Sequence, residues 1–140
     1  MKPVNQTIVD KDIGDCLRAC VASLLEIPIE VVPNFRQEAK SSKSGNGLSA
    51  ANRWLKTMGI GLFQTAWMND SNWSDMHTVY CIFTVPSQRF PDILHHVVGR
   101  AIKVDSYVSR WEIVHDPNPA NKPYKINDVL RVAFIVQLCG

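Results

Sequence analysis

The sequence predicts an α+β fold in which helices come first and an antiparallel sheet follows. Two helical patterns of apolar residues lie before Gly59, and five segments rich in Val, Ile, Phe, Thr and Tyr come after it. Strands that follow one another without intervening helices pair antiparallel, so we expect the helices to pack on one face of the sheet. No repeat, low-complexity tract or linker divides the chain, which predicts a single domain over residues 1–140.

The chain begins with an extended arm, residues 1–12, and the first helix is expected directly after it. Asp15 is the predicted N-cap, Cys16 lies on the first turn, and Pro28 ends the apolar helical spacing. Two prolines in segment 27–35 predict a short turn packed on the core.

A polar, glycine-containing run over residues 37–47 predicts a loop. A second helix is expected over residues 48–58, with Gly59 ending it. Alternating and β-branched residues then predict strands over residues 60–67, 78–85, 94–104, 111–115 and 131–138.

Composition and charge exclude several classes of protein. Hydrophobic residues make up 46% of the chain and charged residues 20%, which is typical of a globular domain. The net charge of +2 comes from scattered residues, so neither nucleic acid nor an anionic membrane is expected as a partner. The first residues lack the pattern of a secretory signal, and no run approaches a membrane span in length. We therefore predict a cytoplasmic protein whose cysteines are thiols.

Cys16 is the first candidate functional residue. A helix N-terminus carries a partial positive charge, which favours the thiolate and lowers the pKa of a cysteine on its first turn. His95 and Asp116 follow in the second half of the chain, each on or at the end of a predicted strand. Cys, His and Asp are the components of a cysteine-nucleophile triad.

The choice of histidine is open on the residues alone. His95 and His96 are neighbours on a predicted strand, so their side chains point to opposite faces and only one is expected to join the site. Asp116 precedes a proline-containing turn, where its carboxylate could accept the far N–H of an imidazole and fix its tautomer.

Acyl transfer also needs donors for the oxyanion, and the expected donors are the Cys16 backbone N–H and the side-chain amide of Gln6. A metal site is not expected, because the cysteines and histidines form neither a C-x2-C nor an H-x3-H pair. The chain has no phosphate-binding glycine loop, and no cofactor is expected.

Three stretches together resemble the papain-like cysteine peptidase superfamily, especially its small bacterial branch, the double-glycine leader peptidases: Gly14–Cys20, His95–Val98 and Val114–Pro117. That branch has Asp-Cys-Gly-x-Ala-Cys at the nucleophile, His-x-Val-Val at the base and Asp-Pro at the orienting carboxylate. The resemblance implies a papain-like fold with Cys16 as nucleophile, His95 rather than His96 as base, and Asp116 as the orienting residue.

Two positions depart from the family pattern. The glycine after the nucleophile is Leu17 in this chain, and the glutamine that stands six residues before the nucleophile is Asp10. Gln6 lies ten residues before Cys16, so its role as oxyanion donor requires a longer intervening loop. The chain also resembles uncharacterised bacterial and phage proteins of this superfamily.

The expected function is a cysteine-dependent hydrolase that cleaves a peptide or isopeptide bond through a thioester at Cys16. Its substrate would be a protein or a flexible peptide. The same triad serves transglutaminases, deamidases and acyltransferases, in which the acceptor differs. A papain-like protein that binds a partner without catalysis is the other alternative, and the absence of glutamine at its family position favours it.

Overall fold

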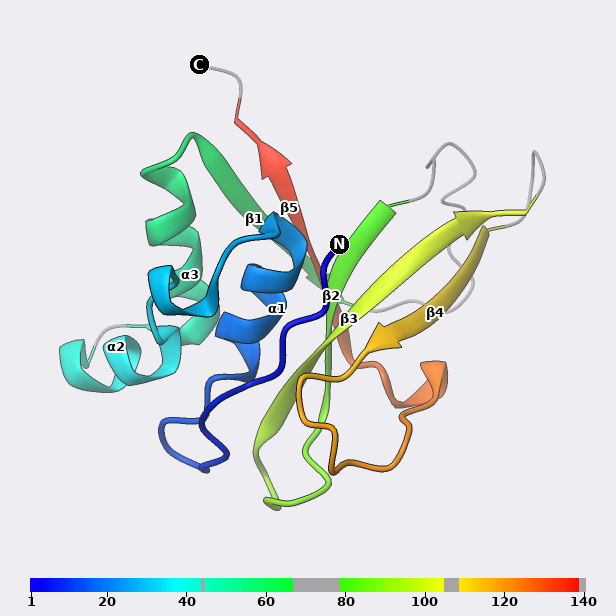
Figure 1. Ribbon diagram of the computed structural model, residues 1–140, viewed down its shortest axis with the longest axis horizontal. Helices are drawn as coiled ribbons and strands as arrows, with labels where there is room; N and C mark the ends of the chain where they lie inside the picture. The colour runs from blue at the N-terminus through cyan, green and yellow to red at the C-terminus, as the bar shows by residue number, and fades with distance from the viewer. Residues whose placement is uncertain (44, 67–78, 105–108, 139–140) are drawn as a thin grey trace.

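In the computed structural model, which describes residues 1–43, 45–66, 79–104 and 109–138, three α-helices pack on a five-stranded sheet (Figure 1). The helices are α1 (Cys16–Leu25), α2 (Phe35–Ser42) and α3 (Gly47–Lys56). The strands are β1 (Ile60–Ala66), β2 (Val79–Pro86), β3 (Leu94–Lys103), β4 (Ser109–His115) and β5 (Arg131–Gln137). Two short 3₁₀ turns are η1 (Ile29–Val31) and η2 (Ile126–Asp128).

The sheet is antiparallel throughout and has the strand order β1-β5-β2-β3-β4. The last strand, β5, therefore lies between β1 and β2 rather than at an edge. In the centre of the sheet Ile82 of β2 stands opposite Val98 of β3 and Ala133 of β5. These three residues are buried and belong to the core that the helices share with the sheet.

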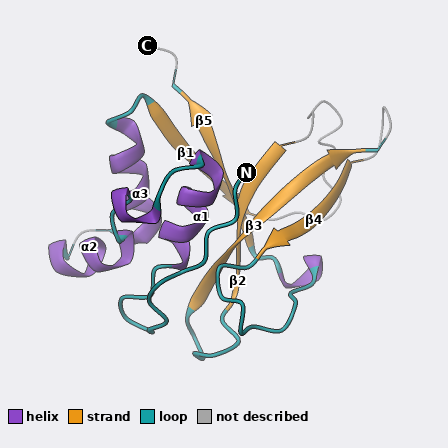
Figure 2. Cartoon of the chain, viewed as in Figure 1, coloured by secondary structure: helices purple, strands orange, loops and turns teal. Residues whose placement is uncertain are grey.

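The helices lie together on one face of the sheet, as Figure 2 shows by colour. Helix α1 packs on β3, and small residues on that helix allow the close approach. Ala19, Cys20, Ala22 and Ser23 are all fully buried. Helix α3 packs mainly on β1, and α2 packs on α3. The α+β order and the packing of the helices on one face agree with the sequence.

The opposite face of the sheet carries a second core. Phe83, Val97 and Val132 are buried there against Trp111 and Tyr124. The Phe83 ring lies over Gly99 so closely that a Cβ atom on Gly99 would stand 2.1 Å from it. The segment that follows β4 covers this second core, and this segment also carries Asp116.

The predicted strands agree with the observed ones to within two residues at the described ends. The predicted ends at Trp67 and Thr78 lie outside the described residues. The second helix expected over residues 48–58 is α3, which runs from Gly47 to Lys56. None of the helices in the described ranges is long and apolar enough to cross a membrane.

The loop predicted over residues 37–47 was wrong for its first half, because α2 occupies Phe35–Ser42. The Asn34 side chain caps this helix by accepting a hydrogen bond from the Gln37 backbone N–H. Phe35 and Ala39 are one helical turn apart, and both are buried. The Arg, Gln, Glu, Ala and Lys residues of this segment also have high helix propensity, which the polar and glycine-containing composition of the longer run concealed.

Candidate active site

Cys16 is the first residue of α1, and the loop before it turns sharply at Gly14. The Gly14 N–H donates to the carbonyl oxygen of Asp10 at 3.0 Å. A Cβ atom on Gly14 would stand 2.4 Å from that oxygen, so the loop closes this tightly only with glycine there. The tight turn at Gly14 therefore places Cys16 at the start of α1.

Asp15 occupies the N-cap position of α1, but its side chain makes no capping hydrogen bond to the helix. The prediction of Asp15 as the N-cap residue is confirmed, and the structure adds that its side chain bonds elsewhere. The buried carboxylate instead accepts hydrogen bonds from the arm: Thr7 N at 2.9 Å, Thr7 Oγ1 at 2.7 Å and Ile8 N at 2.8 Å. The first-turn N–H groups of α1 are thus not occupied by the side chain of their own cap residue.

His95 lies at the start of β3, beyond the point where β4 ends. β4 pairs with β3 only as far as His115, which stands opposite Val98. The chain then leaves the sheet at Asp116, and Asp116 Oδ1 lies 2.7 Å from His95 Nε2. This contact leaves Nδ1 as the ring nitrogen of His95 that is free to interact with the thiol.

Asp116 is itself held in place by its neighbours. The Asn118 backbone N–H donates to Asp116 Oδ1 at 2.8 Å, and Asn121 Nδ2 donates to Oδ2 at 2.9 Å. The ring of Tyr124 stacks on the imidazole of His95, with centroids 5.9 Å apart. The carboxylate and the imidazole are therefore fixed in orientation before any ligand binds.

The charges of the site follow from these contacts. Burial alone would raise the pKa of the Cys16 thiol, but hydrogen bonds with His95 and His96 lower it to about 5. Burial would likewise lower the pKa of His95, but hydrogen bonds with Asp116 and Cys16 raise it to about 9. Between about pH 5 and about pH 9 the pair is therefore a thiolate and an imidazolium.

Asp116 completes this charge arrangement. Burial opposes its ionisation, yet hydrogen bonds from His95, Asn118 and Asn121 hold the pKa of the Asp116 carboxyl below its usual value. Asp116 thus carries a negative charge beside the imidazolium of His95.

The expectation that only one of the two neighbouring histidines can join the site was wrong. His96 Nδ1 lies 3.6 Å from Cys16 Sγ, on the other side of the sulfur from the cavity that His95 lines. His95 and His96 are neighbours on β3, at the part of that strand that pairs with β2 but lies beyond the end of β4. Both rings form a hydrogen bond with the thiol there.

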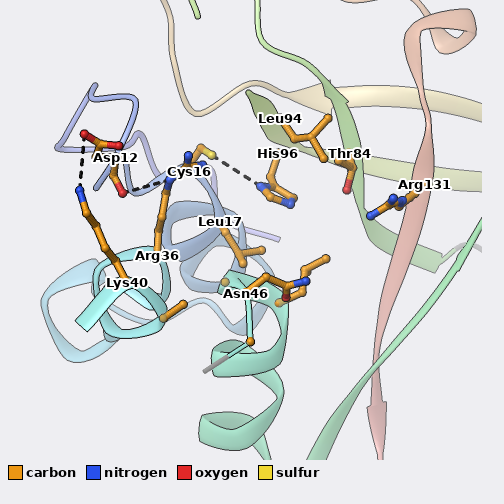
Figure 3. Close-up of a pocket in the computed structure, with 15 residues that line it drawn as sticks. Asp12, Cys16, Leu17, Arg36, Lys40, Asn46, Thr84, Leu94, His96 and Arg131 are labelled. Atoms are coloured by element: carbon orange, nitrogen blue, oxygen red, sulfur yellow. Dashed lines mark hydrogen bonds and ion pairs between the residues drawn. The ribbon is translucent and has the colours of Figure 1, made fainter. Parts of the chain in front are cut away.

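Cys16 borders two cavities of different size. The larger, of about 480 Å³, is open toward the helices, and His96, Thr84 and Arg131 line it with Cys16 (Figure 3). The smaller, of about 30 Å³, lies on the His95 side of the sulfur and is also lined by Gln6 and Asn121.

Gln6, the side-chain oxyanion donor expected from the sequence, lies in the arm before α1. Its backbone N–H donates to the Pro117 carbonyl at 2.9 Å, and its Nε2 donates to the Ile8 carbonyl at 3.0 Å. The Gln6 side chain borders the smaller cavity together with Cys16 and His95. Asp10, which stands where the resembled family has its glutamine, borders the same cavity.

Cys20 lies one turn below Cys16 and is fully buried. Burial, together with the nearby charges of Cys16 and Asp116, raises the pKa of Cys20 well above its usual value, so this thiol is unreactive in the folded protein. In the described part of the chain, no three His, Cys, Asp or Glu side chains are grouped so that they could hold a metal ion.

Sequence reasoning missed two residues of the site, Asn121 and Tyr124, and the resemblance set His96 aside in favour of His95. No periodicity or motif marks Asn121 as a hydrogen-bond partner of Asp116 or Tyr124 as a stacking partner of His95.

No protein-family model matches the chain, and no curated protein or solved structure matches it significantly.

Proposed function

We propose that this chain is a cysteine-dependent hydrolase of the papain-like kind that cleaves a peptide or isopeptide bond through a thioester at Cys16. The observation that carries the proposal is the arrangement of Cys16, His95 and Asp116, with a thiol pKa of about 5 beside an imidazole pKa of about 9. An enzyme needs such a pair to hold a nucleophile ionised and to supply a proton to the leaving group.

The reaction we propose has two steps. Cys16 Sγ attacks the carbonyl carbon and forms a C–S bond, while the C–N bond breaks and the His95 Nδ1 proton moves to the leaving amine. His95 then takes a proton from water, whose oxygen attacks the thioester, and the C–S bond breaks to release the acid. The imidazolium and thiolate are restored. Asp116 keeps the imidazole in one tautomer and stabilises its charge.

Two donors are available for the oxyanion of each tetrahedral intermediate. The Cys16 backbone N–H lies at the N-terminus of α1, which favours negative charge. Gln6 Nε2 uses one of its N–H groups on the Ile8 carbonyl and has a second for the smaller cavity.

Hydrolysis and aminolysis of the thioester differ only in the acceptor that attacks it. The smaller cavity beside His95 has a volume of about 30 Å³, which holds about one or two water molecules. Water can therefore reach the thioester beside the base, and hydrolysis is the form of acyl transfer that we propose.

The alternative is a protein of the same fold that binds a partner without catalysis. Asp10 at the position of the family glutamine favours it, because a carboxylate cannot donate to an oxyanion. Substitution of Cys16→Ala separates the two: an enzyme loses its effect while remaining folded, and a binder retains its partner.

The direct test is the pH dependence of Cys16 alkylation by iodoacetamide, mapped to each cysteine by mass spectrometry. We expect labelling of Cys16 to rise near pH 5, because alkylation requires the thiolate. Cys20 and Cys81 are buried with raised pKa values and serve as unreactive internal references. Cys139 lies outside the described residues, so each cysteine is mapped separately.

The matched variants are His95→Ala and His115→Gln. His95→Ala removes a hydrogen bond that lowers the Cys16 pKa, so its labelling should require a higher pH. His115 contacts the Val4 carbonyl rather than the thiol, and glutamine can preserve that contact, so the labelling profile should stay unchanged. Labelling that rises only near the ordinary thiol pKa of about 8.5 and ignores His95 would refute the proposal.

A further inference from the structure

The larger cavity beside Cys16 has a strongly basic lining. Arg36, Lys40 and Arg131 border it, against a single carboxylate, Asp12. Its remaining walls are partly apolar, with Leu17, Leu48 and Leu94. A ligand that suits this cavity therefore combines a negative charge with a short apolar portion.

Two of the three cations already have partners. Lys40 Nζ lies 3.5 Å from Asp12 Oδ2, and Arg36 Nε donates to the Asp12 backbone carbonyl at 3.1 Å. Among the described residues, the guanidinium group of Arg131 has no hydrogen-bond or ion-pair partner. Figure 3 shows its side chain directed toward Thr84 and His96. Arg131 is thus the cation that a ligand in this cavity would meet unpaired.

Arg131 belongs to a polar row that ends at the nucleophile. Thr84 of β2 stands opposite His96 of β3 on one side and opposite Arg131 of β5 on the other. Adjacent strands are about 4.8 Å apart, so the row from His96 to Arg131 spans about 10 Å. At its near end His96 Nδ1 lies 3.6 Å from Cys16 Sγ, and His96 Nε2 is buried without a partner among the described residues.

We propose that the larger cavity binds the acyl part of a peptide substrate that carries an acidic side chain, with the carboxylate paired to Arg131. The inference rests on the proposed function, because it places the reacting carbonyl at Cys16. His95 protonates the leaving group from the smaller cavity, so the acyl part occupies the other side of the sulfur. Arginine suits this role because its planar guanidinium binds a carboxylate through two parallel hydrogen bonds.

The test compares two alkylating probes that differ in one group. N-iodoacetyl-glutamate α-amide carries a side-chain carboxylate, and N-iodoacetyl-glutamine α-amide carries a carboxamide of the same size. The rate of Cys16 labelling is measured for each probe, and the ratio of the two rates is divided by the same ratio for free cysteine. Arg131 is exposed, so we expect the carboxylate probe to be preferred by about three- to fivefold, the upper scale of an ion pair at the surface.

Three variants locate the origin of that preference. Arg131→Gln should bring the ratio to within about twofold of one, and Arg131→Lys should retain part of the preference because the charge remains. Arg89→Gln removes the same charge from the smaller cavity on the other side of Cys16 and should leave the ratio unchanged. Thermal melting and continued protection of Cys20 report that each variant is folded.

The outcomes separate this inference from the proposed function. A wild-type ratio near one, or a ratio that Arg131→Gln does not lower, would overturn the acidic-substrate inference while rapid labelling at low pH still supports the enzyme. If Arg131→Gln and Arg89→Gln lower the ratio of labelling rates equally, the preference comes from the overall charge of the protein. That result would also overturn the acidic-substrate inference. An ordinary pH profile with the carboxamide probe would instead refute the thiolate–imidazolium pair itself.

Discussion

Asp116 is the residue on which the charge state of its two partners depends. It accepts from His95 at 2.7 Å and, with the thiol, raises the pKa of the imidazole to about 9. The imidazolium in turn lowers the pKa of Cys16. A substitution of Asp116 should therefore change the pKa of Cys16 through His95, without a direct contact between the two side chains.

Asp116→Asn tests this dependence. An amide cannot carry the negative charge that stabilises the imidazolium, so the pKa of His95 should fall and that of Cys16 should rise. We expect the pKa of Cys16 to rise by about two units. Since pH 6 lies one unit above the wild-type value of about 5, iodoacetamide labelling of Cys16 at pH 6 should then slow by about tenfold. Asn121→Ala removes only one hydrogen bond to Asp116 and should slow labelling by less than about threefold. Unchanged labelling in Asp116→Asn would show that the carboxylate does not tune the thiol.

The sequence predicts Cys16, His95 and Asp116 as candidate site residues, because residue type, the start of a helix and the end of a strand are local signals. It could not show that His96 also reaches the sulfur. That contact depends on how α1 packs on β3, which brings together segments 80 positions apart. Such tertiary packing leaves no mark in the hydrophobic pattern.

The N-terminal arm, residues 1–12, joins the elements that carry the two halves of the site. On one side Thr7 and Ile8 bond to the buried carboxylate of Asp15 beside α1. On the other side the Gln6 N–H donates to the Pro117 carbonyl, and His115 Nε2 lies 2.8 Å from the Val4 carbonyl. The arm therefore fixes α1 relative to the end of β4.

Asp15→Ala should be strongly destabilising, and Asp12→Ala should not. The first leaves the Thr7 and Ile8 N–H groups without their acceptor in a part-buried site, which we expect to cost about 2–4 kcal/mol in the free energy of unfolding. The second removes an exposed ion pair with Lys40 and should cost less than about 0.5 kcal/mol. Urea denaturation measures both. Similar losses in the two variants would mean that the arm is not held through Asp15.

At the level of elements, the strands were predictable and α2 was not. The strands are rich in β-branched and aromatic residues, which is a strong local pattern. Helix α2 has a negative mean hydropathy, and only Phe35 and Ala39 are buried. Its burial depends on packing against α3, where the Phe35 ring contacts Trp54, and the sequence does not display that tertiary contact.

Over the whole molecule, the site is assembled from residues that are far apart in the chain. Cys16 and His96 are separated by 80 positions, and His95 and Asp116 by 21. Cores on both faces of one sheet hold these segments together. The shared sheet implies that the activated thiol should be lost together with the fold.

A urea titration tests that coupling. Tryptophan fluorescence follows unfolding, and brief iodoacetamide labelling of Cys16 at pH 6 follows the activated thiol. We expect the two midpoints to coincide, because a chain of this size with shared cores unfolds in one transition. Exposure of Cys20 to the reagent marks global unfolding as a control. Loss of Cys16 activation at clearly lower urea would show that the site opens locally first.

The place of β5 in the sheet has a consequence for how the chain is made. Cys16 is synthesised before residues 131–137, which form β5. The sheet is complete only when β5 has inserted between β1 and β2. Until then, the sheet that carries His95 and His96 has a gap at its centre, and Cys16 is an ordinary thiol on a nascent peptide. For the enzyme that we propose, the order of synthesis therefore delays the activation of Cys16 until β5 has completed the sheet.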